Sequence, residues 1–265
     1  YLVGTSNSAT GTIANDDPRV TVAAAPVSVI ENGTANTTYT FKRTGPTTNP
    51  LTVTFNVGGT ATFNTDYAAT GATTFTETTG SVTFLAGQAS KSVVIDPTGD
   101  TLVEANETVI LTLATGIDYV VGTPLAATVT ITNDDTEVSV AVSPSSVDEN
   151  GTPNLIYTFT RIGVTTNSLS VNFTVGGTAT FTSDYSQTGA ASFNSTLGKI
   201  TFSAGQTTKT ITINPTGDSS EEPDETVMLT VTPGATYSAG AANSALGTIT
   251  NDDGLLLLSL IEELP

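Results

Sequence analysis

The pentapeptide Ile131-Thr132-Asn133-Asp134-Asp135 returns as Ile249-Thr250-Asn251-Asp252-Asp253, and the two copies are 118 residues apart. An earlier version, Ile13-Ala14-Asn15-Asp16-Asp17, lies the same distance upstream. A long period without gaps is the signature of a tandem repeat. Each copy follows a run in which apolar and hydroxyl side chains alternate, which is typical of a β-strand. We therefore expect each copy to close one repeat unit at the end of a strand.

This repeat predicts the domain organisation. Residues 18–135 and 136–253 are identical at 64 of 118 aligned positions, so we expect two complete modules. Residues 1–17 align with the end of the first module, and we interpret them as the last strand of a preceding repeat. Residues 254–265 form an apolar tail with no counterpart after the first module. The tail could pack on another module, pack on another chain or begin a further domain.

Alternation with a period of two predicts seven strands in the first module, and the second module repeats them. No apolar spacing typical of a helix is sustained in either module. Seven short antiparallel strands in a module of this size predict an all-β fold of two tandem seven-stranded immunoglobulin-like sandwiches. Only Thr136 and Glu137 lie between Asp135, which ends the first module, and Val138 in the first strand of the second, so we expect the modules to stack end to end. The predicted strands of the first module are 20–29, 38–44, 51–57, 81–85, 92–95, 108–113 and 127–132.

The composition excludes several functions. Seven Lys and Arg stand against 25 Asp and Glu, and the net charge is −18, which disfavours nucleic acid and anionic membranes as partners. The apolar runs are far shorter than the ~20 residues that span a bilayer, so we expect no membrane span in this segment. The chain has no His and no Cys. It therefore lacks a conventional base for a Ser nucleophile, and we expect no enzymatic activity.

The acids fall in particular loops of the predicted sandwich. Strands that alternate up and down bring the first, third and fifth connections, and the end of the last strand, to one end. That end collects seven acids in the first module and ten in the second, which predicts tighter or more extensive ion binding by the second. Arg161 and Lys209, like Arg43 and Lys91, flank loops at the opposite end, which we expect to be basic.

Such a gathering of carboxylates requires a counter-ion. Two carboxylates ~5 Å apart repel by roughly 3 kcal/mol at an effective dielectric constant near 20. Calcium fits this composition because it takes six to eight oxygen ligands in a flexible geometry. Magnesium would use fewer carboxylates, and zinc would require His or Cys. The alternative is that the acidic loops are merely solvated, but that does not explain why loops far apart in sequence share an end.

Several motifs are similar to those of one family. They are Val29-Ile30-Glu31-Asn32-Gly33, Gly59-Thr60-Ala61 with Asp66-Tyr67, Gly99-Asp100 with Glu104 and Glu107, and the Asn-Asp-Asp ending. Together they resemble tandem Calx-β domains, which are calcium-binding sandwiches of sodium/calcium exchangers, integrin β4 and many bacterial surface proteins. The resemblance implies that Ca2+ is held by the loops at one end. Gly99 and Gly217 depart from the family, because the richest sites carry an additional Asp there.

The resemblance also implies the metal ligands position by position. Asn133 and Asn251 belong to the set as amides where a carboxylate could stand. In the first module the candidates are Glu31, Asp66, Asp100, Glu104, Glu107, Asn133, Asp134 and Asp135. In the second module they are Glu149, Asp184, Asp218, Glu222, Glu225, Asn251, Asp252 and Asp253.

These observations lead to one functional hypothesis and two alternatives. We expect calcium-binding structural or adhesive repeats of a secreted or cell-surface protein, in a bacterium, in which calcium rigidifies the junction between modules. The expected partners are calcium ions, neighbouring Calx-β repeats and other protein chains, through adhesion or self-assembly. The alternatives are a calcium-sensing regulatory module of a membrane protein and a subunit of a calcium-dependent extracellular filament or surface layer.

Overall fold

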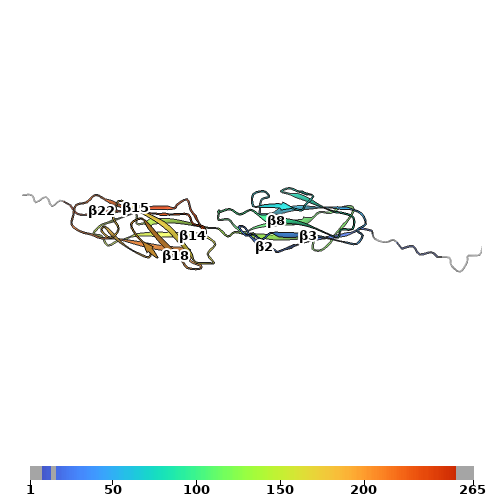
Figure 1. The fold of residues 1–265 in the computed structure, drawn as a ribbon, viewed down its shortest axis with the longest axis horizontal. Helices are drawn as coiled ribbons and strands as arrows, with labels where there is room; N and C mark the ends of the chain where they lie inside the picture. The colour runs from blue at the N-terminus through green and yellow to red at the C-terminus, as the bar shows by residue number, and fades with distance from the viewer. Residues whose placement is uncertain (1–7, 13–15, 255–265) are drawn as a thin grey trace, which may run out of the picture. The chain divides into compact units, whose positions relative to one another are not determined.

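The computed structural model describes residues 8–12 and 16–254, and these residues form strands and turns without a helix. The chain divides into two compact units: the first contains residues 1–99 and 105–133, and the second contains residues 134–265 together with the short segment 100–104. In Figure 1 the first unit carries the labels β2, β3 and β8, and the second carries β14, β15, β18 and β22. The all-β prediction is confirmed.

The first unit is a sandwich of two sheets. One sheet has the strand order β10-β1-β3-β8-β5, and the other has β2-β11-β9-β4-β7-β6. The strands are β1 (Arg19–Ala25), β2 (Ser28–Ile30), β3 (Thr37–Thr44), β4 (Leu51–Gly59), β5 (Tyr67–Thr70), β6 (Thr74–Phe75), β7 (Thr79–Phe84), β8 (Ser90–Pro97), β9 (Glu107–Leu113), β10 (Val120–Val121) and β11 (Ala126–Thr132).

The second unit repeats this topology strand for strand. Its sheets have the orders β16-β19-β14-β12-β21 and β13-β22-β20-β15-β18-β17. The strands are β12 (Thr136–Ser143), β13 (Ser146–Asp148), β14 (Leu155–Gly163), β15 (Leu169–Gly177), β16 (Tyr185–Thr188), β17 (Ser192–Phe193), β18 (Leu197–Phe202), β19 (Thr208–Pro215), β20 (Glu225–Val231), β21 (Ser238–Ala239) and β22 (Ser244–Thr250).

All seven predicted strands are present in the first unit, but each unit has more strands than predicted. The first predicted strand divides at Pro26 into β1, which pairs with β3, and β2, which pairs with β11 in the other sheet. A proline suits this position, because it has no N–H to donate to a neighbouring strand. The strands that the alternation missed are β5, β6 and β10. They have two to four residues each, which is too short for a period of two to show.

The core follows from the alternation. In β4 every second side chain from Leu51 to Val57 is buried, and the side chains between them are exposed. Burial of the large apolar side chains is the main force that holds the two sheets together, at roughly 25 cal/mol per Å² of apolar surface. Tyr67 and its counterpart Tyr185 are each 1% exposed, so they belong to the core. The largest fully buried side chains are Tyr39, Tyr67, Tyr157, Tyr185, Phe41, Phe55, Phe84, Phe159, Phe173, Phe202, Ile95 and Leu111.

A buried tyrosine joins the two sheets of each unit. The Tyr39 hydroxyl, on β3, donates to the Val109 carbonyl on β9 at 2.6 Å. In the second unit the Tyr157 hydroxyl donates to the Val227 carbonyl at 2.5 Å. Burial raises the pKa of both phenols, so the hydroxyl stays protonated and remains a donor. The sandwich is therefore linked by a hydrogen bond as well as by apolar packing.

The expected basic end is only partly basic, because two of its cations are buried. Arg43 is 5% exposed and Arg161 is 4% exposed. The Arg161 guanidinium donates to the carbonyl of Asn167 at 2.9 Å and also to that of Val164. Arg43 bonds the Asn49 carbonyl in the same way, at 2.8 Å. These arginines hold the loops that follow β3 and β14 and do not contribute a surface charge.

Two of the predicted segments lie largely outside the described residues. Of residues 1–17, the structure describes 8–12 and 16–17, and these form no strand. Of the tail 254–265, it describes only Gly254. The interpretations of both segments therefore stay predictions.

Candidate metal centre

A first group of carboxylates forms where β13 and β22 end together. The two strands are parallel neighbours, and Asp148 pairs with Thr250 at their ends. Glu149 therefore emerges beside Asp252 and Asp253, and its N–H donates to the Thr250 carbonyl at 2.9 Å. One oxygen from each of Glu149, Asp252 and Asp253 lies within 4.8 Å of the others. Glu149 is 8% exposed, so this group is partly enclosed.

Polar contacts hold this first group in place. The Asn150 amide donates to Asp252 Oδ1 at 2.8 Å and to the Asp218 carbonyl at 3.3 Å. The N–H of Asp218 in turn donates to Glu149 Oε1 at 3.2 Å. Three segments that are distant in sequence, those around Glu149, Asp218 and Asp252, are thus tied into one unit. Their oxygens are positioned by the fold before any ligand binds.

A second group forms at the start of β16 and β20. Asp184 precedes β16, and Glu225 is the first residue of β20. The loop before β20 also contributes Glu222, and one oxygen from each of these three acids lies within 4.8 Å of the others. The Thr180 N–H donates to Asp184 Oδ2, which fixes the orientation of that carboxylate. Both groups of the second unit lie at the end where the sequence predicted the acids to gather.

Burial and the crowding of charge together shift the protonation of two carboxyl groups. Burial, followed by the charge of Asp184 and a hydrogen bond with it, raises the pKa of Glu225 to about 7. Burial also raises the pKa of Glu149, although the Asp218 N–H opposes the shift. Without a cation, the folded chain therefore retains a proton in the second group near neutral pH. A bound cation would favour the ionised forms instead.

The donor atoms of the first group fit a calcium ion. Ca2+ binds oxygens at about 2.3–2.6 Å, so two oxygens on one ion are at most ~5 Å apart. The 4.8 Å limit within the group meets this condition. In addition, Asp253 Oδ2 is buried and has no hydrogen-bond partner among the described residues. A buried carboxylate oxygen of this kind is costly unless a cation or a donor satisfies it.

The first repeat gathers the equivalent acids. Glu31, Asp134 and Asp135 form one group, and Asp66, Glu104 and Glu107 form the other, each within the same 4.8 Å limit. Glu31 is 6% exposed, which is close to the value for Glu149. The Thr62 N–H donates to Asp66 Oδ2 at 2.6 Å, as Thr180 does to Asp184. The pattern of two groups is thus a property of the repeat.

Four predicted ligands lie outside these groups. Asp100 and Asp218 use one carboxylate oxygen to accept a backbone N–H two residues later, at 2.6 Å in both cases. Asn251 accepts from the N–H groups of Glu222 and Asp253, each at 3.4 Å. The Asn251 side chain therefore supports two acids of different groups. Asn133 is its counterpart in the first repeat.

The sequence did not single out Asn150 or its counterpart Asn32. The signal was their position directly after the glutamate of the Glu-Asn-Gly motif in both repeats. These asparagines also explain why Gly217 and Gly99 stand where other members of the family can carry an additional Asp. A Cβ atom at Gly217 would lie 1.9 Å from Asn150 Oδ1. A Cβ atom at Gly99 would lie 2.0 Å from Asn32 Oδ1. The amide thus occupies the space that a further carboxylate would need.

Several solved structures are similar to the chain. CBD12 from CALX1.2 is 16% identical, with 86% of this chain and 99% of that chain covered and a TM-score of 0.39. The apo form of the Calx CBD1 domain is 23% identical, with 45% of this chain and 99% of that chain covered and a TM-score of 0.36. The C-terminal domain of the AgI/II polypeptide BspA from Streptococcus agalactiae is 9% identical, with coverages of 88% and 99% and a TM-score of 0.33. No curated protein matches the chain.

A family model described as the Calx-beta domain matches the chain twice, over residues 14–135 and 132–253. Together the two matches span most of the chain, and they follow the repeat boundaries to within a few residues. The two matched ranges contain all four carboxylate groups. The chain belongs to the Calx-beta domain family, of which it carries two domains in tandem.

Proposed function

We propose that the chain provides calcium-binding structural or adhesive repeats of a secreted or cell-surface protein. The observation that carries the proposal is the group of Glu149, Asp252 and Asp253, in which a buried Asp253 oxygen has no hydrogen-bond partner among the described residues. Carboxylates this close repel one another, and a bound cation or a proton would offset that repulsion. The two groups of the second unit together have six carboxylates, which supply hard oxygen donors of the kind that calcium prefers.

The test is a thermal melt of the chain with calcium and with a chelator. A ligand that binds only the native state stabilises it by about 2.7 kcal/mol at a hundredfold excess over Kd. We therefore expect both unfolding transitions to move to higher temperature with calcium, while an equal concentration of magnesium has a smaller effect. Isothermal titration then gives the affinity. Identical melts in calcium and in chelator would refute calcium binding.

A pair of variants assigns the effect to the site. Glu149→Gln keeps the size of the side chain and removes one charge from the first group. We expect it to weaken calcium binding at the second unit by tenfold or more, since it removes a ligand charge. Glu137→Gln is the matched control, because Glu137 lies on β12 and in neither group. Equal losses in the two variants would mean that calcium responds only to net charge.

Calcium is also proposed to stiffen the junction between the domains. Asp134 and Asp135 belong to a carboxylate group, and β12 begins at the next residue, Thr136. A cation on these acids would restrain the main chain directly before the second domain. Small-angle scattering of residues 18–253 should give a longer, narrower distance distribution with calcium than with chelator. An unchanged distribution in a sample with calorimetrically confirmed binding would refute the mechanical role.

The location is part of the proposal. Support comes from the acidic composition, which suits an environment rich in calcium ions. None of the described residues forms a helix that could cross a bilayer. Extracellular calcium is in the millimolar range, which matches the weak sites of extracellular modules, at about 10⁻⁴–10⁻³ M. A measured affinity in the nanomolar range would instead indicate a cytosolic calcium sensor.

A further inference from the structure

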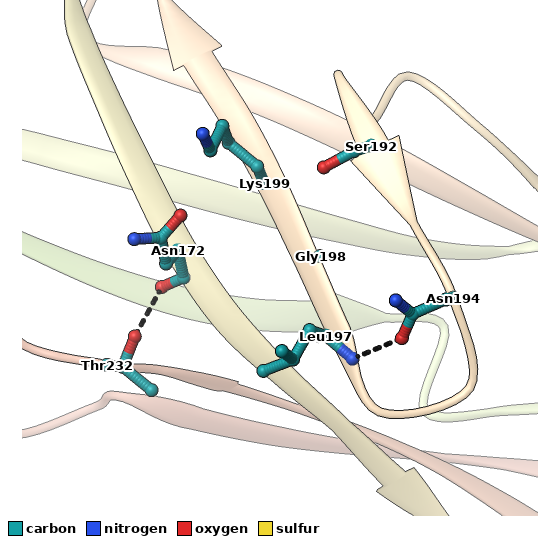
Figure 2. A pocket seen from close by; sticks show the side chains of 7 residues that line it. All are labelled: Asn172, Ser192, Asn194, Leu197, Gly198, Lys199 and Thr232. Carbon is teal, nitrogen blue, oxygen red and sulfur yellow. Dashed lines mark hydrogen bonds between the residues drawn. The ribbon is translucent and has the colours of Figure 1, made fainter.

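The outer face of the second unit carries a groove of about 500 Å³, whose lining combines polar side chains with an apolar surface that includes Leu197. A row of residues crosses four chain segments there, because Ser192 on β17 pairs with Lys199 on β18, and Lys199 pairs with Asn172 on β15. Thr232, directly after β20, continues the row through its N–H, which donates to the Asn172 carbonyl at 3.1 Å. Figure 2 shows these side chains around the groove, with Leu197 and Asn194 at its end.

The backbone groups of Asn172 are hydrogen-bonded, whereas several side-chain donors of the groove have no partner among the described residues. The Asn172 carbonyl accepts from Thr232 Oγ1 at 3.1 Å, and the Asn172 N–H donates to the Tyr237 hydroxyl at 2.9 Å. Asn194 Oδ1 accepts the Leu197 N–H at 2.8 Å, which leaves the Asn194 amide nitrogen as a donor. The Lys199 ammonium has no carboxylate partner within the part of the chain that the structure describes. The Asn172 amide likewise has no hydrogen-bond partner there.

The equivalent place in the first unit is built differently. Ser81 stands where the second unit has Lys199, and it is 8% exposed. Its hydroxyl is paired with that of Thr74 at 2.7 Å. Thr54 and Ala114 replace Asn172 and Thr232. The fold therefore does not require a cation or an amide at this place, and only the second unit carries both.

We propose that this groove binds a sugar unit that carries one carboxylate. The Lys199 ammonium would pair with the carboxylate, and a charge-assisted hydrogen bond of this kind is about twice as strong as one between neutral groups. The amides of Asn172 and Asn194 and the Ser192 hydroxyl would bond the sugar hydroxyls, since each can act as a donor. Leu197, which is 56% exposed, offers an apolar surface for the C–H groups of the ring.

The net charge of the chain restricts the class of ligand that the groove could bind. At a net charge of −18 the chain repels polyanions, so a densely charged glycan would be disfavoured even with Lys199 present. A single carboxylated unit, free or at the end of a neutral glycan, carries little of this penalty. The groove volume also accommodates a unit of this size. A carboxylate without a sugar would use only Lys199.

The test is a titration of the isotope-labelled chain with D-glucuronate, followed by amide chemical shifts. We expect saturable shifts at Asn172, Asn194 and Lys199 with glucuronate and much smaller ones with D-glucose, which lacks the carboxylate. Lys199→Ser, which installs the residue of the first unit, should weaken glucuronate binding about tenfold, as the loss of one charge-assisted hydrogen bond predicts. Lys209→Ser, a charge loss on the other sheet, should leave binding unchanged.

Other outcomes would overturn the proposal. No shifts at these residues, or equal binding by Lys199→Ser, would show that the groove is not a site. Acetate shifts as large as those with glucuronate would refute the sugar and leave a bare carboxylate contact. Shifts that appear at the carboxylate groups only when calcium is present would mean that the ligand is held by the ion. The amide spectrum of each variant shows directly whether it is folded.

Discussion

The two repeats carry different charges at one position where their geometry is the same, which is Asn106 in the first repeat and Asp224 in the second. Asn106 Oδ1 accepts the Asn133 N–H at 3.1 Å in the first repeat, and Asp224 Oδ1 accepts the Asn251 N–H at 3.1 Å in the second. The same bond is made by an amide and by a carboxylate, and Asp224 lies in neither carboxylate group. The additional acid therefore has a structural task that a neutral residue performs equally well. A count of acids overstates the difference between the two sites.

This comparison weakens the argument that the second repeat binds more calcium because it contains more acids. Ten acids against seven predicted more ions or a higher affinity for the second repeat. Each repeat, however, has two carboxylate groups with equivalent members. We therefore expect the number of ions to be the same in both repeats and the affinity to differ only through more distant charges. The following experiments test the equivalence of the repeats, beginning with the largest expected effect.

Removal of a central aromatic ring should unfold one repeat and spare the other. Phe173 is fully buried and packs against Phe159, with ring centroids 5.3 Å apart. A Phe→Ala change in a core of this kind costs about 3–5 kcal/mol. Calorimetry of Phe173→Ala should show one lowered transition and one unchanged transition. Phe55→Ala, at the equivalent position of the first repeat, is the reciprocal control, and if either variant lowered both transitions, the repeats would not fold independently.

Loss of the bond between sheets should have a moderate effect. Tyr157→Phe removes only the hydroxyl and leaves the Val227 carbonyl without that donor, which costs about 1–3 kcal/mol. Urea unfolding should show the same loss for Tyr39→Phe in the first repeat. Tyr237→Phe removes a less enclosed hydroxyl, since Tyr237 is 7% exposed, and should cost less. Wild-type stability of Tyr157→Phe would show that this bond contributes nothing.

The second repeat should depend on pH when calcium is removed. Glu225 has a pKa of about 7 in the folded chain against an ordinary value of 4.5. The folded state therefore binds more protons between these values, and its free energy of unfolding should fall as pH rises from 4.5 to 7. Above that range the dependence should level off. Chelator-treated melts across this range measure it, and Glu225→Gln should remove much of the slope, whereas Glu137→Gln should preserve it.

The smallest effect is expected for the residue that distinguishes the repeats. Asp224→Asn installs the amide of the first repeat, keeps the bond to the Asn251 N–H and removes one distant charge. We expect calcium affinity at the second repeat to fall by less than about tenfold, because a charge outside the coordination shell acts through water. Titration calorimetry measures this change. A loss as large as that of Glu149→Gln would mean that Asp224 is a calcium ligand. The larger number of acids in the second repeat would then again predict stronger calcium binding there.

Much of this architecture could be predicted because two periodicities carry it. The repeat of 118 residues predicted two domains, and alternation predicted seven strands, since strands such as β4 bury every second side chain. The up-and-down topology then placed the acids at one end. The short strands β5, β6 and β10 could not be predicted, because their pairing depends on neighbours that are distant in sequence.

The details of the site were less accessible for the same reason. Its supporting bonds join residues about 70 to 100 positions apart, such as Asn150 with Asp218 and with Asp252. No local pattern encodes such a bond. The sequence also did not predict the burial of Arg161, since an arginine at the end of a strand is usually exposed. Only the folded loop shows that two carbonyls are its partners.

The parallel pairing of β2 with β11, and of β1 with β10, has a mechanical consequence for each domain. The chain enters a domain at β1 and leaves it at β11, and in both pairs the strands run in the same direction. A pulling force on the two ends of a domain would therefore act along these strands and load all their hydrogen bonds together, in shear. Bonds loaded together resist more force than bonds that open one at a time. A tether built from such domains would stay folded under tension until both short pairs fail.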